Sequence, residues 1–424
     1  MDLPIIEPTP LEERMAGAAE VLEPLEGPEV ESSQGTRRWP HWTRVLGRAP
    51  RFLTAMIVNA RRGDAGPHSL THTTTFKCNY HCKEICDSPL VHQVMQQQPN
   101  GKDLTTDEVE KIYQQLPQMD YVRFTGGEPT LRRDAVKLTH LAEQYLKPIV
   151  MHLTTNASLP DRVVQFAEQR PRNVPLDLMI SIDGVGEQHC RSRHNDKAYQ
   201  RCMETLEQLA PRQLELRMTI RINQTIVGGQ GISEYRKLHA ALKPYDVRHQ
   251  VVLAYDASAT YALQRNRSYA PTANELFTPV GEITTQEMDD LYRIVMDDVR
   301  QELTGPERWI QQYYMDGIRN RLNQKVAAPN PACVALASHL RIFPNGDVPT
   351  CQFNSQTIGN LRLQSFAEVW QGESRKRQRA WVRNCVGCWA GCEVQPSAAY
   401  TGDLLRHQWR PNKGDAVSVS PSEA

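Results

Sequence analysis

The chain has no excess of charge of either sign, because 49 lysines and arginines balance 49 aspartates and glutamates among its 424 residues. A long-range field that would attract nucleic acid is therefore not expected. The chain also lacks an apolar run as long as a membrane span. The longest in the amino-terminal region, residues 52–60, covers nine residues and includes Thr54 and Asn59. The first residues are acidic where a secretory signal would be basic. These absences predict a cytoplasmic protein without a transmembrane segment.

Cysteine, in contrast, is abundant: the chain has 10 cysteines, most of them in two groups. In a chain expected to stay in a reducing cytosol, grouped cysteines predict metal ligation rather than disulfide bonds. Two others, Cys190 and Cys202, are isolated in the sequence, and Cys202 is expected to pack on the apolar side of a helix.

The amino-terminal region changes sign abruptly. Residues 1–36 are rich in proline and glutamate, with nine acids and only Arg14 as a base before Ser32, which predicts a disordered or loosely docked tail. Residues 37–70 are predicted to form a basic amphipathic helical segment. Its apolar face is expected to pack on its own domain and leave the arginines in water. Peripheral membrane contact through residues 37–62, or an acidic partner, is the alternative.

From about residue 73, short β-type segments alternate with amphipathic segments, which is typical of β/α repeats. Six repeats predict an α/β fold, a partial (β/α)6 TIM-like barrel over residues 71–260. A helical connection is expected over 261–330, a small β-hairpin/helix domain over 331–400 and a tail over 401–424. The expected strands are 73–77, 121–125, 149–154, 176–182, 216–222 and 249–254. The expected helices are 106–116, 134–146, 160–169, 199–209, 286–300 and 307–323.

The first cysteine group, Cys78, Cys82 and Cys86, directly follows the first expected strand. A closed structural site uses four ligands, so three thiolates most naturally hold an iron–sulfur cluster with one iron left open to bind something else. A structural zinc site, or a partly buried cysteine cluster without metal, is the alternative from spacing alone.

A second motif, Gly126, Gly127, Glu128 and Pro129, follows the second expected strand. The glycines let the backbone come close to a ligand, the proline stiffens the exit, and the carboxylate can receive an ammonium group. Because parallel barrels build their active sites from loops at the carboxyl ends of the strands, this motif and the cysteine loop are expected on one rim.

Together these motifs resemble the radical S-adenosylmethionine (radical SAM) superfamily, in which three cysteines hold a [4Fe–4S] cluster whose unique iron is chelated by SAM. The usual spacing is three residues and then two between the cysteines. This chain has three and three, and Ile85 replaces the aromatic residue often found before the third cysteine. The resemblance covers about residues 73–255. It implies that the three cysteines are the catalytic cluster ligands and that the second motif binds SAM.

The resemblance extends to polar residues near the ends of strands three to five. Ala157 stands where the family has glycine, so a less close backbone approach is expected there. Read alone, Ser181 would be a strand-end hydroxyl and Asp183 a turn former. The resemblance implies SAM-binding roles for Asn156, Ser181, Asp183, Arg221 and Asn223.

Five cysteines lie in the carboxyl-terminal part. Two of them flank a predicted hairpin made of residues 340–343, a turn at 344–347, and residues 348–351. Without the upstream motifs, this part would suggest a zinc ribbon. With them, it resembles the SPASM and twitch extensions of radical SAM enzymes, which hold auxiliary [4Fe–4S] clusters; five thiols suffice for one, so a twitch-like version is favoured. The resemblance implies ligation by Cys333, Cys351, Cys385 and Cys388, with Cys392 as a substitute ligand or a spare.

The resemblance implies a radical SAM oxidoreductase or maturase. Such an enzyme cleaves SAM reductively to a 5′-deoxyadenosyl radical and abstracts hydrogen from a small molecule or peptide, causing oxidation or bond formation. The implied cofactors are the SAM-binding 4Fe-4S cluster, S-adenosyl-L-methionine and an auxiliary 4Fe-4S cluster, with an electron donor such as flavodoxin or ferredoxin. Residues 1–70 do not resemble a leader-peptide-binding module, which favours a small molecule or a separately presented protein substrate. The alternatives are a ribosomal-peptide maturase of the SPASM type and a non-catalytic zinc or iron–sulfur scaffold protein.

Overall fold

The computed structural model describes residues 42–82, 86, 88–97, 100–254, 281–354, 356–385 and 387–409. The predictions made for residues 1–41, for Ile85, for 255–280 and for 410–424 lie outside the described residues.

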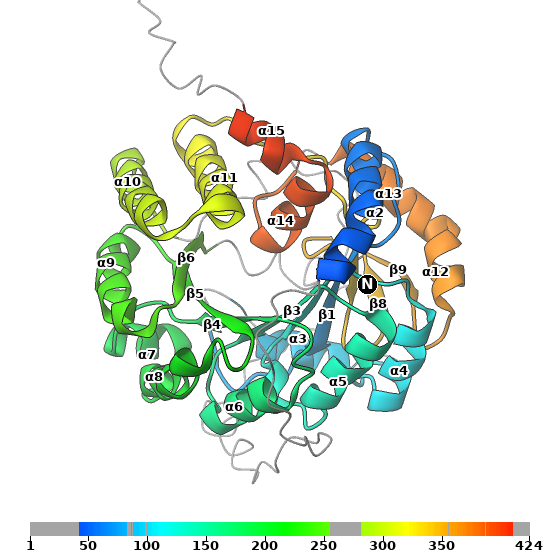
Figure 1. The fold of residues 1–424 in the computed structure, drawn as a ribbon, viewed down its shortest axis with the longest axis horizontal. Helices are drawn as coiled ribbons and strands as arrows, with labels where there is room; N and C mark the ends of the chain where they lie inside the picture. Colours follow the sequence, from blue (N-terminus) through cyan, green and yellow to red (C-terminus); the bar gives the residue numbers. More distant parts are fainter. Residues whose placement is uncertain are drawn as a thin grey trace, which may run out of the picture.

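A parallel seven-stranded sheet forms the centre of the protein, in the order β6-β5-β4-β3-β2-β1-β7 (Figure 1). This confirms the predicted α/β barrel-like fold class. The strands of the sheet are β1 (Ser69–Thr75), β2 (Tyr121–Gly126), β3 (Val150–Thr155), β4 (Leu176–Ser181), β5 (Met218–Ile226), β6 (Arg248–Leu253) and β7 (His339–Ile342). A separate antiparallel pair consists of β8 (Asp347–Pro349) and β9 (Thr357–Asn360).

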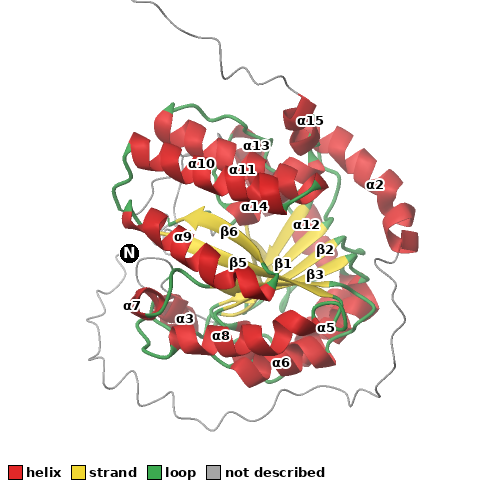
Figure 2. Ribbon diagram, turned by 60° about the vertical axis from the view of Figure 1, so that its left-hand side comes forward, coloured by secondary structure: helices red, strands yellow, loops and turns green. Residues whose placement is uncertain are grey.

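Helices cover both faces of the sheet. The first half of the chain supplies α2 (Trp42–Ala60), α3 (Ser88–Gln96), α4 (Thr106–Gln115), α5 (Ala135–Leu141), α6 (Pro160–Gln169), α7 (Glu187–Arg193), α8 (Ala198–Leu209) and α9 (Gln230–Leu242). The second half supplies α10 (Thr285–Glu302), α11 (Gly305–Asn323), α12 (Phe366–Gln371), α13 (Glu373–Asn384), α14 (Gly391–Tyr400) and α15 (Asp403–Trp409). Short helical turns cover Pro129–Leu131, Ala142–Leu146, Ala210–Arg212 and Lys243–Tyr245. Figure 2 shows α5, α6 and α8 on one side of the sheet and α10, α11 and α14 on the other.

Sequence signals account for most of these elements. Thr105 and Glu108 form a capping box at the start of α4, and Thr284 and Glu287 form one at the start of α10. The apolar residues of β1–β5 pack against α4, α5, α6 and α8 in one large core. The predicted strands and helices lie within a few residues of the observed ones. Two strands differ most from the prediction: β1 starts at Ser69 rather than residue 73, and β5 ends at Ile226 rather than residue 222.

Strand β1 starts early because its polar side chains are buried between neighbours on both sides. The hydroxyl of Thr71 lies 2.9 Å from Nε2 of His339, and Nδ1 of His72 lies 2.7 Å from the hydroxyl of Tyr113. A threonine- and histidine-rich segment has a weak apolar pattern, so its first residues were not predicted as strand.

The predicted hairpin at residues 340–351 is wrong in its pairing. The turn exists, because the amide of Gly346 donates to the carbonyl of Phe343 at 2.9 Å. The residues before it, however, form β7, which pairs in parallel with β1 from Ser69↔His339 to His72↔Ile342. The residues after it form β8, which pairs with β9. The amide of Phe343 also donates to the carbonyl of Asp347 at 2.8 Å, which closes the turn, but beyond it β7 continues the parallel sheet while β8 pairs with β9.

Helix α2 lies beside α14, near the end of the sheet that β1 and β7 form (Figure 1). Phe52 and Ala55 pack with Val334 and Tyr400, so the apolar face does pack on its own domain. The expectation that the arginines remain in water is wrong for several of them. Arg44 pairs with Glu143 at 2.7 Å and Arg48 with Asp120 at 3.1 Å. No helix in the described part of the chain has the length and apolar character of a membrane span.

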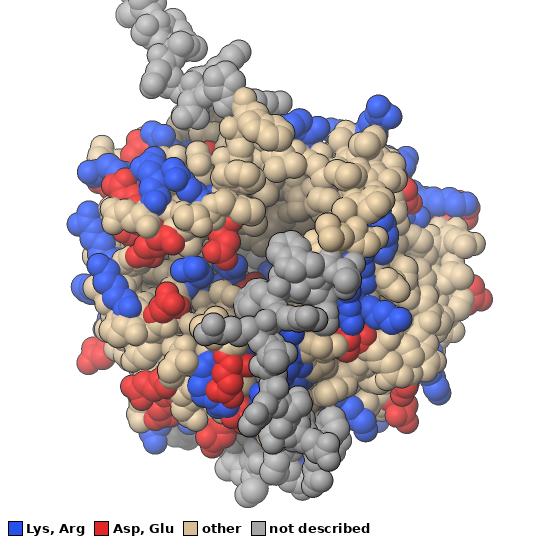
Figure 3. Space-filling model, in the orientation of Figure 1, with Lys and Arg blue, Asp and Glu red and all other residues tan. Residues whose placement is uncertain are grey.

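The surface has no single-sign region in the view of Figure 3, where basic and acidic side chains are interspersed and the surface is hollowed near its centre. This distribution agrees with the balanced composition of the chain.

Asp120 ties α2 to the rest of the protein, and its replacement tests this role. The carboxylate contacts Arg48, lies 3.0 Å from Nδ1 of His68 and accepts from the Tyr400 hydroxyl at 3.3 Å. Asp120→Ala leaves a buried guanidinium unpaired, so we expect the free energy of unfolding to fall by about 3 kcal/mol in anaerobic urea denaturation. The control Glu143→Ala removes a more exposed pair and should cost less than about 1 kcal/mol. Equal losses for the two variants would contradict the role given to Asp120.

Candidate active site

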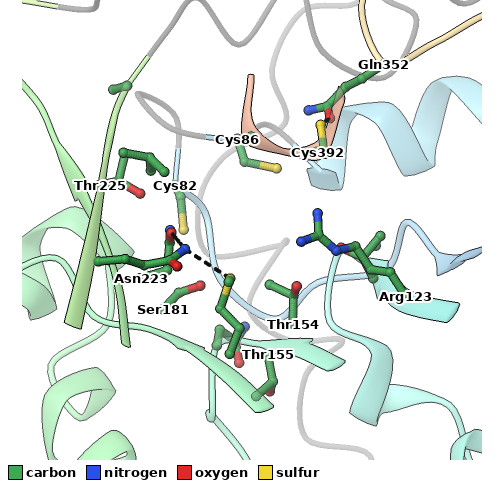
Figure 4. Close-up of a pocket in the computed structure, with 18 of the residues that line it drawn as sticks. Cys82, Cys86, Arg123, Thr154, Thr155, Ser181, Asn223, Thr225, Gln352 and Cys392 are labelled. Carbon is green, nitrogen blue, oxygen red and sulfur yellow. Dashed lines mark hydrogen bonds between the residues drawn. The ribbon is translucent and has the colours of Figure 1, made fainter. Parts of the chain in front are cut away.

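A cavity of about 260 Å³ lies at the carboxyl ends of the barrel strands. Its wall contains the first cysteine group, Cys78, Cys82 and Cys86, and also Cys392 from the carboxyl-terminal group (Figure 4). A second cavity of about 290 Å³ adjoins it, and the two share part of their lining, including Arg123 and Cys392. Residues from the two distant cysteine groups therefore meet around one space.

The first cysteine group lies in the loop after β1. Cys78 and Cys82 pack with Tyr80, Ala198 and Cys190. Burial raises the pKa of the Cys78 and Cys82 thiols, so without a metal they keep their protons at neutral pH. A bound cluster would have to displace these protons, since thiolates are the ligands. Three soft thiols on one cavity wall supply the ligand type of an iron–sulfur cluster, although no three potential ligands among the described residues are arranged to hold a metal ion.

Cys190, predicted to be isolated, instead packs against the first cysteine group, and its thiol donates to the carbonyl of Asp196 at 3.1 Å. More than 100 residues separate it from Cys82 in the sequence, which hid the contact. Cys202 packs as predicted, fully buried in the main core on α8.

Arg193, at the end of α7, contacts the first cysteine group and was not predicted. Its Nη1 lies 3.6 Å from Sγ of Cys82, and its Nη2 lies 2.7 Å from Oδ2 of Asp183. The guanidinium lowers the cost of forming a thiolate at Cys82, although burial has the larger effect on that pKa. Asp183 also accepts from the hydroxyl of Ser192 at 2.6 Å and the amide of Thr225 at 3.1 Å. Its SAM-binding role stays a prediction, and its observed contacts hold Arg193 in place.

Glu128 connects the second motif to the loop after β3. Its carboxylate is fully buried and accepts from the Thr155 hydroxyl at 2.8 Å and the Asn156 amide at 2.7 Å. It also accepts from the amide and hydroxyl of Thr130, at 3.1 and 2.7 Å. Pro129 is buried and starts the short helical turn that follows. Neither side chain is part of the cavity lining, so their predicted cofactor-binding roles stay predictions.

Asn156 carries this connection on to the cysteine loop. Its Nδ2 donates to Oδ1 of Asn79 at 3.2 Å and lies 3.7 Å from Sγ of Cys78. The next residue, Ala157, is fully buried with φ of +50°. A left-handed alanine costs roughly 1 kcal/mol relative to a relaxed conformation, so alanine here fills a position suited to glycine.

Gly126 and Gly127 line the cavity and also press the end of β2 against the cysteine loop. The amide of Gly127 donates to the carbonyl of Thr75, and the amide of Glu128 to that of Lys77, each at 2.8 Å. A Cβ on Gly127 would lie 2.2 Å from the Lys77 carbonyl oxygen. The glycines are therefore required for contact between two protein segments, independently of any ligand.

The remaining predicted residues lie in two places. Ser181 and Asn223 line the first cavity together with Thr225 (Figure 4). Arg221 lines the second cavity, where it pairs with Asp177 at 2.6 Å and Glu307 at 2.8 Å. Both Arg221 and Asn223 lie within β5, which continues to Ile226, rather than after the strand.

Four cysteines of the carboxyl-terminal group, Cys351, Cys385, Cys388 and Cys392, pack around Phe353 and Ala390. Burial raises the pKa of each of these four thiols. Burial also raises the pKa of Cys333, to about 12. Like charge between neighbouring thiolates raises these pKa values further: Cys385 acts on Cys333, Cys333 acts on Cys351, and both Cys333 and Cys351 act on Cys388. All 10 cysteines are free, so this group offers thiols to a metal centre.

Trp389 anchors this cysteine group to α11. Its indole is fully buried, and Nε1 donates to the carbonyl of Tyr314 at 2.9 Å. The guanidinium of Arg321 lies 3.9 Å from the ring centroid. A Cβ on Gly317 would lie 1.8 Å from the indole, so the helix approaches the ring through glycine.

Two family models match this chain. The radical SAM superfamily model matches residues 73–238, and the model of the SPASM iron–sulfur cluster-binding domain matches residues 333–389. A PqqA peptide cyclase of Bradyrhizobium diazoefficiens is 27% identical over 384 residues, covering 83% of this chain and 85% of the relative. A GTP 3′,8-cyclase of Actinobacillus pleuropneumoniae serotype 3 is 29% identical over 119 residues, covering 28% of this chain and 32% of the relative.

Two solved structures are also similar. Native anSMEcpe with bound AdoMet has 17% identity and a TM-score of 0.48, covering 73% of this chain and 83% of that one. Streptococcus suis SuiB has 17% identity and a TM-score of 0.48, covering 80% of this chain and 73% of that one.

Proposed function

We propose that this chain, a radical SAM enzyme with a SPASM-type iron–sulfur domain, modifies a peptide by hydrogen abstraction in the cavity between its two cysteine groups. The observation that carries this proposal is that Cys78, Cys82 and Cys86 share one cavity with Cys392. A substrate in this space would lie next to both groups at once.

The cofactors are SAM, a cluster on the barrel and an auxiliary cluster on the SPASM-type domain. We assign Cys78, Cys82 and Cys86 to the first cluster. We assign Cys333, Cys351, Cys385 and Cys388 to the auxiliary one. When bound, the first cluster and SAM supply a radical that can remove hydrogen from an unactivated carbon.

The residues of the chain bind, orient and exclude water. Ser181 and Asn223 offer hydrogen-bonding groups on the wall next to the first cysteine group, and Gly126 and Gly127 bring backbone to the same wall. Glu128 stabilises that wall by accepting from the amide of Asn156, whose side chain in turn contacts Cys78. Apolar residues of the cavity lining, such as Met179 on β4 and Leu253 on β6, limit access of water.

A peptide is favoured over a small molecule by the PqqA peptide cyclase, which matches most of this chain. The absence of a recognisable leader-binding segment in residues 1–70 was the argument for a small molecule, and much of that segment lies outside the described residues. A peptide presented by a separate partner protein satisfies both observations.

Deuterium transfer tests the proposal directly. Reduced enzyme is incubated anaerobically with SAM and extract from cells grown in deuterated medium, and 5′-deoxyadenosine is analysed by mass spectrometry. We expect deuterium to appear in 5′-deoxyadenosine. After ultrafiltration of the extract, the peptide-sized fraction should contain the substrate that donates this deuterium. Transfer only from the smallest fraction would instead establish a small-molecule substrate.

Metal analysis of the same preparation separates the enzyme from a zinc scaffold. We expect iron and sulfide near eight each per chain, as two [4Fe–4S] clusters require, and no stoichiometric zinc. About half of that iron and sulfide would indicate a single cluster.

A further inference from the structure

The first cavity has an unbalanced charge. Three arginines line it, Arg123, Arg193 and Arg341, whereas none of the described residues in its lining is an aspartate or glutamate. Arg193 forms an ion pair with Asp183 at 2.7 Å, and Arg341 forms one with Glu393 at 3.0 Å. This leaves Arg123 as the cation whose charge has no counterpart among the described ion pairs.

Arg123 is held in this position by the alternation of β2. Val122 and Phe124 point into the main core, so Arg123 points to the opposite face, which is the interior of the barrel. Its guanidinium carbon lies 6.0 Å from the ring centroid of Tyr121, with whose side chain it also shares a hydrogen bond, and its Nε has no hydrogen-bond partner among the described residues. Figure 4 shows Arg123 on the side of the cavity near Cys392 and Gln352, across from Ser181 and Asn223.

A desolvated arginine with an unused donor is costly unless a ligand pairs with it. Its guanidinium offers a planar fork of donors that matches a carboxylate better than any neutral group does. Resting on the proposed function, we propose that Arg123 binds a carboxylate of the substrate, such as a glutamate or aspartate side chain of a peptide, and so orients the neighbouring carbon in the cavity.

The second cavity supports this choice. Arg123 lines both cavities. The second also contains Phe52, Ile310 and Ala399, and its two carboxylates, Asp177 and Glu307, are both paired with Arg221. A substrate whose carboxylate lies at Arg123 could therefore place an apolar group beside it. The proposed substrate class is a peptide with an acidic residue next to an apolar one.

Binding of two matched probes tests the proposal without turnover. N-acetyl-glutamate N-methylamide carries the carboxylate, and N-acetyl-glutamine N-methylamide is its neutral counterpart. Each is titrated calorimetrically into full-length, cluster-reconstituted protein saturated with SAM. We expect the acidic probe to bind at least about tenfold more tightly, as a charge-assisted bidentate contact allows. Glutarate serves as a third probe, and its binding with failure of the acidic amide would show that a free dicarboxylate, not a peptide residue, fits the site.

Variants of Arg123 identify the residue responsible. Arg123→Gln should lose the preference for the acidic probe, and Arg123→Lys should keep part of it, because lysine retains the charge but not the fork. The control Arg248→Gln, which removes an arginine that pairs with Glu307 at 3.4 Å, should keep the full preference. A preference that survives in Arg123→Gln overturns the proposal.

Two other outcomes also overturn it. If Arg123→Gln weakens SAM binding as much as probe binding, Arg123 serves the carboxylate of SAM. If it changes the iron content or the electron paramagnetic resonance signal of the auxiliary cluster, Arg123 compensates the charge of a cluster near Cys392. Because no outcome depends on hydrogen abstraction, this experiment can fail while the deuterium-transfer test succeeds, and the reverse.

Discussion

Cys82→Ala is expected to reduce the formation of 5′-deoxyadenosine to the level measured without enzyme. Cys82 is buried, it lines the cavity, and its thiol is the one that Arg193 contacts. With one of three thiols removed, the first cysteine group cannot hold a cluster with a single open iron. The measurement is the yield of 5′-deoxyadenosine from SAM under reducing, anaerobic conditions.

The matched control is Cys388→Ala, in the carboxyl-terminal group. Because Cys388 is assigned to the auxiliary cluster, its loss should lower the iron content by about half, as expected for one of two [4Fe–4S] clusters. Because Cys388 is absent from the lining of the first cavity, most uncoupled SAM cleavage should remain. Equal cleavage by the wild type and Cys82→Ala would refute the assignment of the first group.

The barrel could be predicted because its signals are local. Strands β2, β3, β4 and β6 coincide with the predicted strands to within one residue, since each is a short apolar segment between amphipathic helices. Their order then places the cysteine loop and the glycine motif on one rim, because parallel strands end on the same side of the sheet.

The residues that sequence reasoning missed depend on contacts between distant segments. β7 pairs with β1 across more than 250 residues, which no local pattern records. Arg193 and Arg341 reach the cavity from α7 and β7, and an isolated arginine on either element has no signal of its own. Of these arginines, Arg123 was the easiest to predict from the sequence. It alternates with Val122 and Phe124 on a strand whose end is predicted to reach the site.

For the glycine motif, the sequence predicts the position but not the contacts. Its position was predicted, but the partner of its backbone was taken to be a ligand. In the structure the amides of Gly127 and Glu128 bind carbonyls of the segment that leads to Cys78. The carboxylate of Glu128 accepts hydrogen bonds from Thr130, Thr155 and Asn156. The motif thus builds the wall of the site from protein–protein contacts, and its integrity determines where the first cysteine group lies.

Gly127→Ala is therefore expected to disrupt the site even though alanine is the smallest possible addition. The added Cβ would lie 2.2 Å from the carbonyl oxygen and 2.6 Å from the carbonyl carbon of Lys77, so backbone rather than a flexible side chain must move. We expect the affinity for SAM to fall by at least about tenfold and the free energy of unfolding to fall by about 3 kcal/mol, measured by calorimetric titration and urea denaturation.

Gly391→Ala is the control for this variant. Gly391 lines both cavities, but a Cβ there would be 3.8 Å from Nε2 of Gln395 and 3.9 Å from Cε2 of Tyr314, which is ordinary contact. It is the first residue of α14, where alanine is a good helix former, so stability should stay the same or rise by up to about 1 kcal/mol. If Gly127→Ala matched Gly391→Ala in both measurements, the segment leading to Cys78 would have to be free to move away from β2, and the wall described for the first cysteine group would be wrong.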